Sequence, residues 1–139
     1  MKTTIVTALL LFLVSNLFSQ KTKESEVPKT VIDAFNTNFS GVKAKSWEKE
    51  KDGTYEVDFD LNKTEASATF NADGTLIETE TEIAIGELPK AVSDYLEKNH
   101  SGKKIKEVEK IVDAEGNVKY EVEIDNKDLL FDQQGNFIK

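Results

Sequence analysis

The chain has 139 residues, 32% of them charged and 38% hydrophobic, which is an ordinary balance for a globular protein. Its formal net charge is −8 and every basic residue is a lysine, so the surface repels nucleic acid and offers no arginine for two-point phosphate binding. Cysteine is absent from the sequence, which excludes disulfides, thiolate metal sites and a cysteine nucleophile.

Residues 1–19 have the layout of a secretory signal peptide. A short start containing Lys2 precedes an apolar run over residues 5–14, and small Ser19 occupies a plausible cleavage position. The apolar run is shorter than the ~20 residues that a membrane-spanning helix needs. We therefore expect a periplasmic or secreted protein that begins near Gln20, has no membrane span after signal removal, and starts with a flexible leader over residues 20–26.

The rest of the chain contains the same pattern twice, over residues 27–77 and 88–138. Pro28 and Pro89, like Gly41 and Gly102, are 61 positions apart. Proline is favoured in the first turn of a helix, and glycine is favoured just past its end. Between these signals each copy has one apolar stripe at helical spacing, which predicts one amphipathic helix per copy; the stripes are Val31, Ala34, Phe35 and Phe39, and Val92, Tyr95, Leu96 and His100.

Alternating apolar and acidic residues follow each predicted helix and indicate half-buried strands. The clearest strand spans residues 54–61, after a two-residue turn signal at Asp52-Gly53. We predict an α+β fold of two tandem repeats, each with one helix followed by a four-stranded antiparallel meander, and helices packed on one face of the sheet or sheets. The repeats would span residues 27–82 and 88–139, with residues 83–87 as a connector.

A family resemblance accompanies this pattern. Tyr55, Val57 and Phe59, and likewise Tyr120, Val122 and Ile124, follow a glycine turn and precede a Phe-x-x-x-Gly-x-Leu/Phe-Ile segment. The sequence thus resembles the PepSY-like, β-lactamase-inhibitor-like group of small exported bacterial proteins. The resemblance implies a helix-plus-sheet repeat, arranged as in β-lactamase inhibitory protein, and a role in binding or inhibition in the cell envelope. That inhibitor is disulfide-bonded and this chain has no cysteine, so β-lactamase inhibition is not carried over.

The sequence shows no catalytic constellation. His100 is the only histidine, and no serine or cysteine nucleophile with a positioned partner accompanies it. A histidine at the end of a helix is favoured there by the helix dipole. We therefore expect a protein that is not an enzyme and that needs no cofactor.

Two rows of carboxylates are the main candidate site. Each row places three acids on one face of a strand, with neighbours ~6.8 Å apart at the ~3.4 Å rise of a strand. A solvated sheet face is the ordinary explanation, and an acidic surface for a protein partner is the functional one. Weak binding of Ca²⁺ or another cation stays open as an alternative, although no calcium-loop spacing is present. The rows are Glu56, Asp58 and Asp60, and Glu121, Glu123 and Asp125.

Trp47 is the remaining candidate, because it lies in an otherwise charged strand. It either completes the core under the first helix or stands exposed as an interface anchor. We hypothesise an exported, non-catalytic binding or inhibitory module that contacts a protein through the helix-free acidic sheet face. Its candidate partner-binding residues are Trp47 and the six acids of the two rows, and no metal ligand or nucleic-acid contact is expected.

Overall fold

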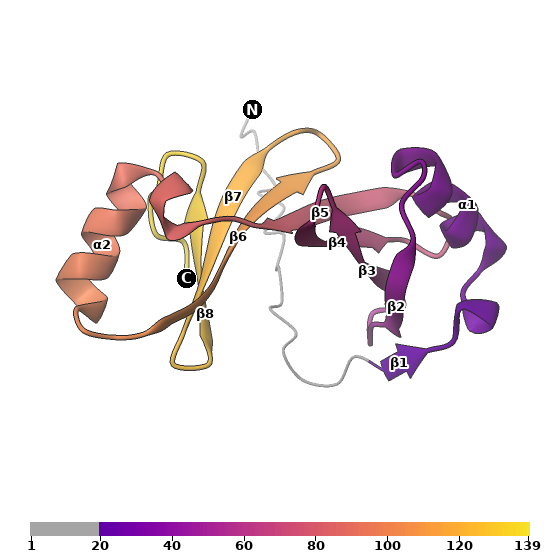
Figure 1. Cartoon of the computed structure of the whole chain (residues 1–139), viewed down its shortest axis with the longest axis horizontal. Helices are drawn as coiled ribbons and strands as arrows, with labels where there is room; N and C mark the ends of the chain where they lie inside the picture. Colours follow the sequence, from indigo (N-terminus) through magenta and orange to yellow (C-terminus); the bar gives the residue numbers. More distant parts are fainter. Residues whose placement is uncertain (1–19) are drawn as a thin grey trace, which may run out of the picture.

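The computed structural model describes residues 20–139, and the predicted signal peptide lies outside these residues. All eight strands form a single antiparallel sheet in which each strand pairs with its neighbours in sequence, as Figure 1 shows. In chain order the elements are β1 (Gln20–Thr22), η1 (Glu24–Glu26), α1 (Lys29–Asn38), β2 (Ala44–Lys49), β3 (Tyr55–Leu61), β4 (Thr64–Phe70), β5 (Leu76–Glu82), η2 (Ile85–Glu87), α2 (Lys90–His100), β6 (Ile105–Asp113), β7 (Val118–Ile124) and β8 (Lys127–Asp132).

The predicted architecture, two repeats of a helix followed by a four-stranded meander, is wrong. Each helix instead lies between two neighbouring antiparallel strands, α1 between β1 and β2 and α2 between β5 and β6. The pairs Gln20–Lys49 and Thr81–Lys110 are equivalent, since both partners differ by 61 positions. Residues 20–26, predicted to be a flexible leader, contain β1 and the short helix η1. These two elements correspond to the end of β5 and to η2, 61 positions further along the chain.

The pairing of β5 explains why the predicted architecture is wrong. This strand pairs with β4 on one side and with β6 on the other, so it joins both halves into one sheet. The corresponding segment at the end of the chain contributes only an isolated bridge between Phe131 and Phe137. Hydrophobic alternation shows which residues face a core, but it does not show which strand lies alongside.

Both helices pack on the same face of the sheet. Residues directly opposite each other on paired strands share a face, and one such row crosses five strands through Val57, Ala68, Thr79, Val112 and Val118. Val57 and Ala68 contact the core of α1, and Val122, four residues after Val118, contacts the core of α2. The helices lie at opposite ends of the molecule (Figure 1). Among residues 20–139, no helix lies on the other face of the sheet.

Each helix forms because its apolar residues recur at the spacing of one face. Val31 and Phe35 of α1 pack against the sheet in one cluster, and Val92 and Leu96 of α2 pack in a second. Pro28 and Pro89 cap the N-termini, as the sequence predicts. Within residues 20–139, neither helix combines the length and the apolar character needed to cross a bilayer.

Candidate functional site

The helix-free side of the sheet gathers carboxylates from four strands. We call this surface the acidic face and define it by Glu56, Asp58, Glu78, Glu80, Glu82, Glu107, Glu109, Glu121 and Glu123. The strand registers place them together: Glu78 lies opposite Asp113, Glu82 opposite Glu109, and Glu109 opposite Glu121. Side chains of a strand alternate between faces, so every second residue of β3, β5, β6 and β7 turns to this side.

The structure brings five of the six predicted acids to this one side. Glu56 and Asp58 project from β3, and Glu121 and Glu123 project from β7. Asp60 is on the same side at the end of β3, where its carboxylate lies 2.6 Å from Lys45 Nζ. Asp125 lies in the turn after β7, with a φ of 54°, and its carboxylate lies 2.9 Å from Lys103 Nζ. Asp125 is therefore not part of the acidic face.

Sequence reasoning missed the centre of this surface. Glu78, Glu80 and Glu82 come from β5 and lie between the two predicted rows, because β5 is the strand that joins the two halves. The signal was present in the sequence, where these acids alternate with Thr79 and Thr81. The alternation resembles that of β3 but lacks large apolar residues on the opposite face.

Neighbouring hydroxyl and ammonium groups stabilise the outer carboxylates. The Ser46 hydroxyl donates a hydrogen bond to Asp58, and Lys106 Nζ lies 2.8 Å from the Glu123 carboxylate, which is only 17% exposed. Like charges directly opposite each other on a sheet destabilise it. These pairs reduce the repulsion at the borders of the acidic face and leave most of it in the middle.

Two partly buried carboxylates, one on either side of β5, hold their protons more tightly than isolated ones. Burial, followed by the charges of Asp58 and Glu50, raises the pKa of Glu56 to about 7. Burial, followed by the charges of Asp128 and Glu109, likewise raises the pKa of Glu121 to about 7. Crowded carboxylates in a partly desolvated site cannot all ionise at neutral pH. The acidic face therefore carries less negative charge near pH 7 than its composition suggests.

Trp47 lies in the core and not on a surface. Its side chain is 4% exposed and meets Phe35 edge-on, with ring centroids 5.7 Å apart. It belongs to β2 and points to the helix side, since it pairs with Val57. The buried indole Nε1 has no hydrogen-bond partner among the described residues. Of the two alternatives for Trp47, the structure thus supports the core position, and we leave Trp47 out of the proposed surface.

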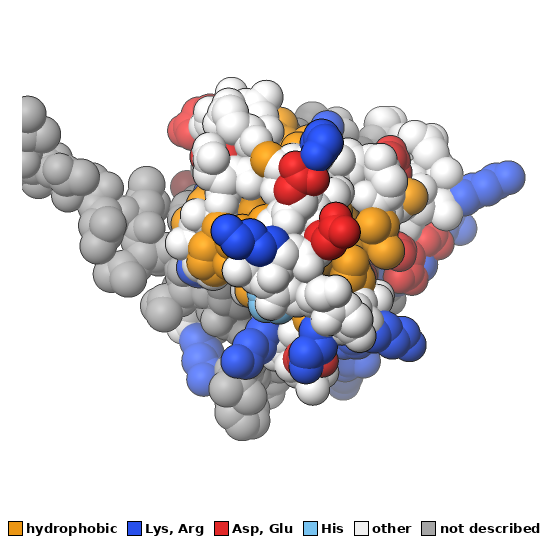
Figure 2. Space-filling model, turned by 90° about the vertical axis from the view of Figure 1, so that its left-hand side faces the viewer, with side chains coloured by type: hydrophobic (Ala, Val, Ile, Leu, Met, Phe, Trp, Pro, Cys, Tyr) orange, Lys and Arg blue, Asp and Glu red, His pale blue; other side chains and the backbone are white. Residues whose placement is uncertain are grey.

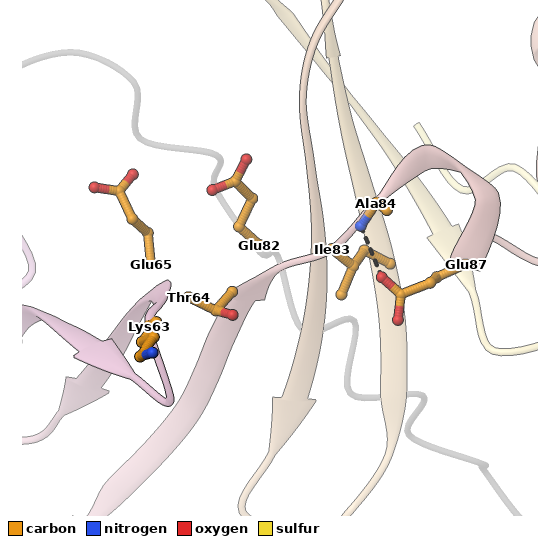
Figure 3. A pocket seen from close by; sticks show the side chains of 7 residues that line it. All are labelled: Lys63, Thr64, Glu65, Glu82, Ile83, Ala84 and Glu87. Atoms are coloured by element: carbon orange, nitrogen blue, oxygen red, sulfur yellow. Dashed lines mark hydrogen bonds between the residues drawn. The ribbon is translucent and has the colours of Figure 1, made fainter.

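A shallow crevice borders the acidic face at the end of β5. It has a volume of about 400 Å³ and is lined by Lys63, Thr64, Glu65, Glu82, Ile83, Ala84 and Glu87. Figure 3 shows the Glu65 and Glu82 carboxylates pointing in the same direction, whereas Glu87 turns back to accept a hydrogen bond from the Ala84 N–H at 2.8 Å. The crevice extends the acidic surface and contains no histidine.

The remaining polar groups form no metal-binding cluster in the part of the chain that is described. No three His, Asp or Glu side chains of residues 20–139 are placed to hold a metal ion together. His100 is the last residue of α2, and its ring lies 6.0 Å from that of Tyr95. At the α2 end of the molecule, lysines and acids are interspersed with hydrophobic side chains (Figure 2). That end therefore lacks the dense cluster of carboxylates that distinguishes the acidic face.

Comparison with known proteins places the chain in a family. A family model described as "Putative beta-lactamase-inhibitor-like, PepSY-like" matches residues 18–77 and 53–139, which confirms the resemblance seen in the sequence. No curated protein matches the chain.

Solved structures share the fold at low identity. A DUF2874 family protein from Bacteroides uniformis has a TM-score of 0.70 at 19% identity, and the match covers 81% of this chain and 86% of that one. A BLIP-like protein from Bacteroides fragilis has a TM-score of 0.63 at 22% identity, and the match covers 81% of this chain and 84% of that one. A Bacteroides eggerthii protein described as "putative periplasmic" has a TM-score of 0.68 at 18% identity, and the match covers 81% of this chain and 86% of that one. This description agrees with the predicted periplasmic or secreted localisation. Because the family model matches two segments that together span residues 18–139, the chain belongs to the β-lactamase-inhibitor-like, PepSY-like family.

Proposed function

We propose that the protein is an exported, non-catalytic binding or inhibitory module of the bacterial cell envelope that contacts a protein partner through the acidic face. One observation carries this proposal: a continuous eight-stranded sheet has both helices on one side and clustered carboxylates from four strands on the other. A relative of this fold is described as periplasmic, which supports a place in the envelope.

The negative charge of the acidic face indicates which kind of partner it would bind. Acids from β3, β5, β6 and β7 create a negative potential that attracts a surface rich in lysine or arginine. Such steering raises association rates and weakens as salt screens the charges. The partner that fits is a protein with a basic surface, bound most tightly at low ionic strength and above the pKa of about 7 of Glu56 and Glu121.

The test is capture of partners from envelope extract by the mature wild-type protein, a face variant and a control variant. Capture is done at about pH 8.5, above the raised pKa values of Glu56 and Glu121. The face variant combines Glu56→Gln, Glu78→Gln and Glu121→Gln. The control removes three charges from the helices through Asp33→Asn, Asp94→Asn and Glu97→Gln. Asp33 and Asp94 pair with Lys29 and Lys90 one helical turn away, and such exposed pairs contribute only about 0.2–0.5 kcal/mol.

We expect the control to retain the partner and the face variant to bind it roughly tenfold more weakly at low salt, within the range of electrostatic steering. The face variant and the control each carry three fewer negative charges than the wild type, so a general charge effect would weaken both variants equally. Equal binding by all three forms would exclude the acidic face as the contact surface.

A further inference from the structure

Two neighbouring hydrophobic side chains are exposed in the segment that follows β8. Phe137 is 42% exposed and Ile138 is 49% exposed. The ring of Phe137 stacks on that of Tyr95 of α2, with centroids 4.8 Å apart and 12° between the planes. This contact holds an exposed aromatic ring at the border of the sheet. We call residues 136–139 the edge segment.

The backbone of Phe137 points outward from the border of the sheet. Phe137 forms an antiparallel bridge with Phe131 of β8. Hydrogen bonds flank this bridge on both sides, one of them from the Ile138 N–H to the Leu130 C=O at 2.8 Å. In an antiparallel pair of this kind, the N–H and C=O of the bridged residues point away from each other. Among residues 20–139, these two groups of Phe137 have no backbone hydrogen-bond partner on another strand.

The first half of the chain shows what covers the equivalent position. Leu76 and Ile77 lie 61 positions before Phe137 and Ile138, and both are half-buried. There the chain at the end of β6 runs along the outer edge, and the Ala114 N–H donates a hydrogen bond to the Ile77 C=O at 2.9 Å. The edge segment therefore repeats a strand edge that a neighbouring strand covers in the first half.

The two ends of the sheet differ in a way that indicates which strand covers the edge segment. At the other end, β1 consists of Gln20, Lys21 and Thr22, and charged residues on an edge strand oppose pairing with another sheet. Head-to-tail association of copies would use that edge and is disfavoured. Two edge segments can instead pair with each other around a two-fold axis.

The symmetric register is also chemically favourable. With Phe137 opposite the same residue of a second copy, the two outward N–H groups donate to the two outward C=O groups. The two aromatic rings then form a cross-strand pair, which stabilises a sheet. Ile138 lies opposite Asn136 of the second copy in this register, so no like charges face each other across the edge segment.

We infer that the edge segment is the contact between two copies of this chain, which pair antiparallel around a two-fold axis at Phe137. The axis is perpendicular to the sheet, so the two sheets continue as one and both acidic faces lie on the same side. The dimer is weak, because a standard interface buries roughly 800 Å² per partner and the edge segment is short. The contact does not depend on the acidic face being a docking surface.

The experiment is sedimentation velocity of the mature protein from about 10 μM to about 1 mM, the range in which weak dimers form. Ile138→Lys places a charge in the contact without removing the backbone groups of the fold. Ile85→Lys is the matched control, because Ile85 is 52% exposed in η2, outside the edge segment, and gains the same charge. Thermal melting verifies that each variant is folded, and amide exchange of the wild type at both concentrations follows the Phe137 N–H.

We expect the average mass of the wild type and of Ile85→Lys to rise toward that of a dimer, and the dimer of Ile138→Lys to be roughly tenfold weaker or more. Exchange of the Phe137 amide should slow as the concentration of the wild type rises. A wild type that stays monomeric, or equal association of all three proteins, would overturn the inference. So would slowed exchange in the amides of β1, because it would indicate head-to-tail pairing. Capture of a basic partner tests the acidic face separately, so failure of either proposal leaves the other standing.

Discussion

Alanine in place of Gly135 or Gly74 is expected to lower the free energy of unfolding by about 2–4 kcal/mol. Both glycines are in turns that pack against the start of a helix, with φ values of +85° and +89°. A Cβ on Gly135 would lie 2.8 Å from the Ala91 Cβ, and one on Gly74 would lie 2.7 Å from the Thr30 carbonyl oxygen. The second contact involves main chain, which cannot turn away, so the helix itself must shift.

Gly116→Ala is the matched control for this effect. Gly116 has a φ of +86° but nothing within 4 Å of its Cβ position, so alanine there carries only the backbone strain of about 1–2 kcal/mol. Urea unfolding of the three variants separates strain from steric contact. We expect Gly74→Ala and Gly135→Ala to lose clearly more stability than Gly116→Ala. Equal losses would show that the turns do not fix the position of the helices.

Phe59→Ala is expected to remove about 3–5 kcal/mol of stability, the usual effect of deleting a buried aromatic ring. Phe59 is fully buried on β3, with ring centroids 5.3 Å from Phe35 and 4.6 Å from Phe39. Because β5 joins the two halves into one sheet, the loss should spread beyond the core of α1. Hydrogen exchange should therefore accelerate in the amides of β7 as well as in those of β3.

The comparison for this prediction is Phe59→Leu, which keeps most of the volume and should lose less stability. Faster exchange confined to residues 20–82 in Phe59→Ala would contradict the single cooperative sheet. It would show instead that each half of the chain unfolds by itself, despite the pairing of β5 with β6.

The sequence allowed local structure to be predicted well where a residue's neighbours in the chain decide its conformation. The strand predicted over 54–61 is β3, Tyr55–Leu61, and α1 begins directly after Pro28. Both features follow from spacing and from the backbone preferences of proline. The family resemblance, which is based on the same patterns, is confirmed.

Pairing between distant segments was not predictable in the same way. The apolar content of residues 20–22 gives no sign of a strand, yet they form β1 because the edge of β2 is available to them. Asp125 continues the acidic alternation of β7 in sequence, but with Asn126 it adopts positive φ and forms the turn instead. The acids of β5 belong to the candidate site only because β5 lies in the middle of the sheet. The local sequence pattern of β5 does not predict this position.

Carboxyl footprinting tests the central claim, that the acidic face is the docking surface, most directly. The mature protein is labelled at its Asp and Glu side chains with a carbodiimide and an amine, with and without the captured partner, at about pH 8.5. Mass spectrometry then reports how far the partner protects each carboxylate. We expect protection of Glu56, Asp58 and Glu121 and unchanged labelling of the helix residues Asp33, Asp94 and Glu97. Protection of the helix residues, with the acidic face labelled as in the free protein, would contradict it.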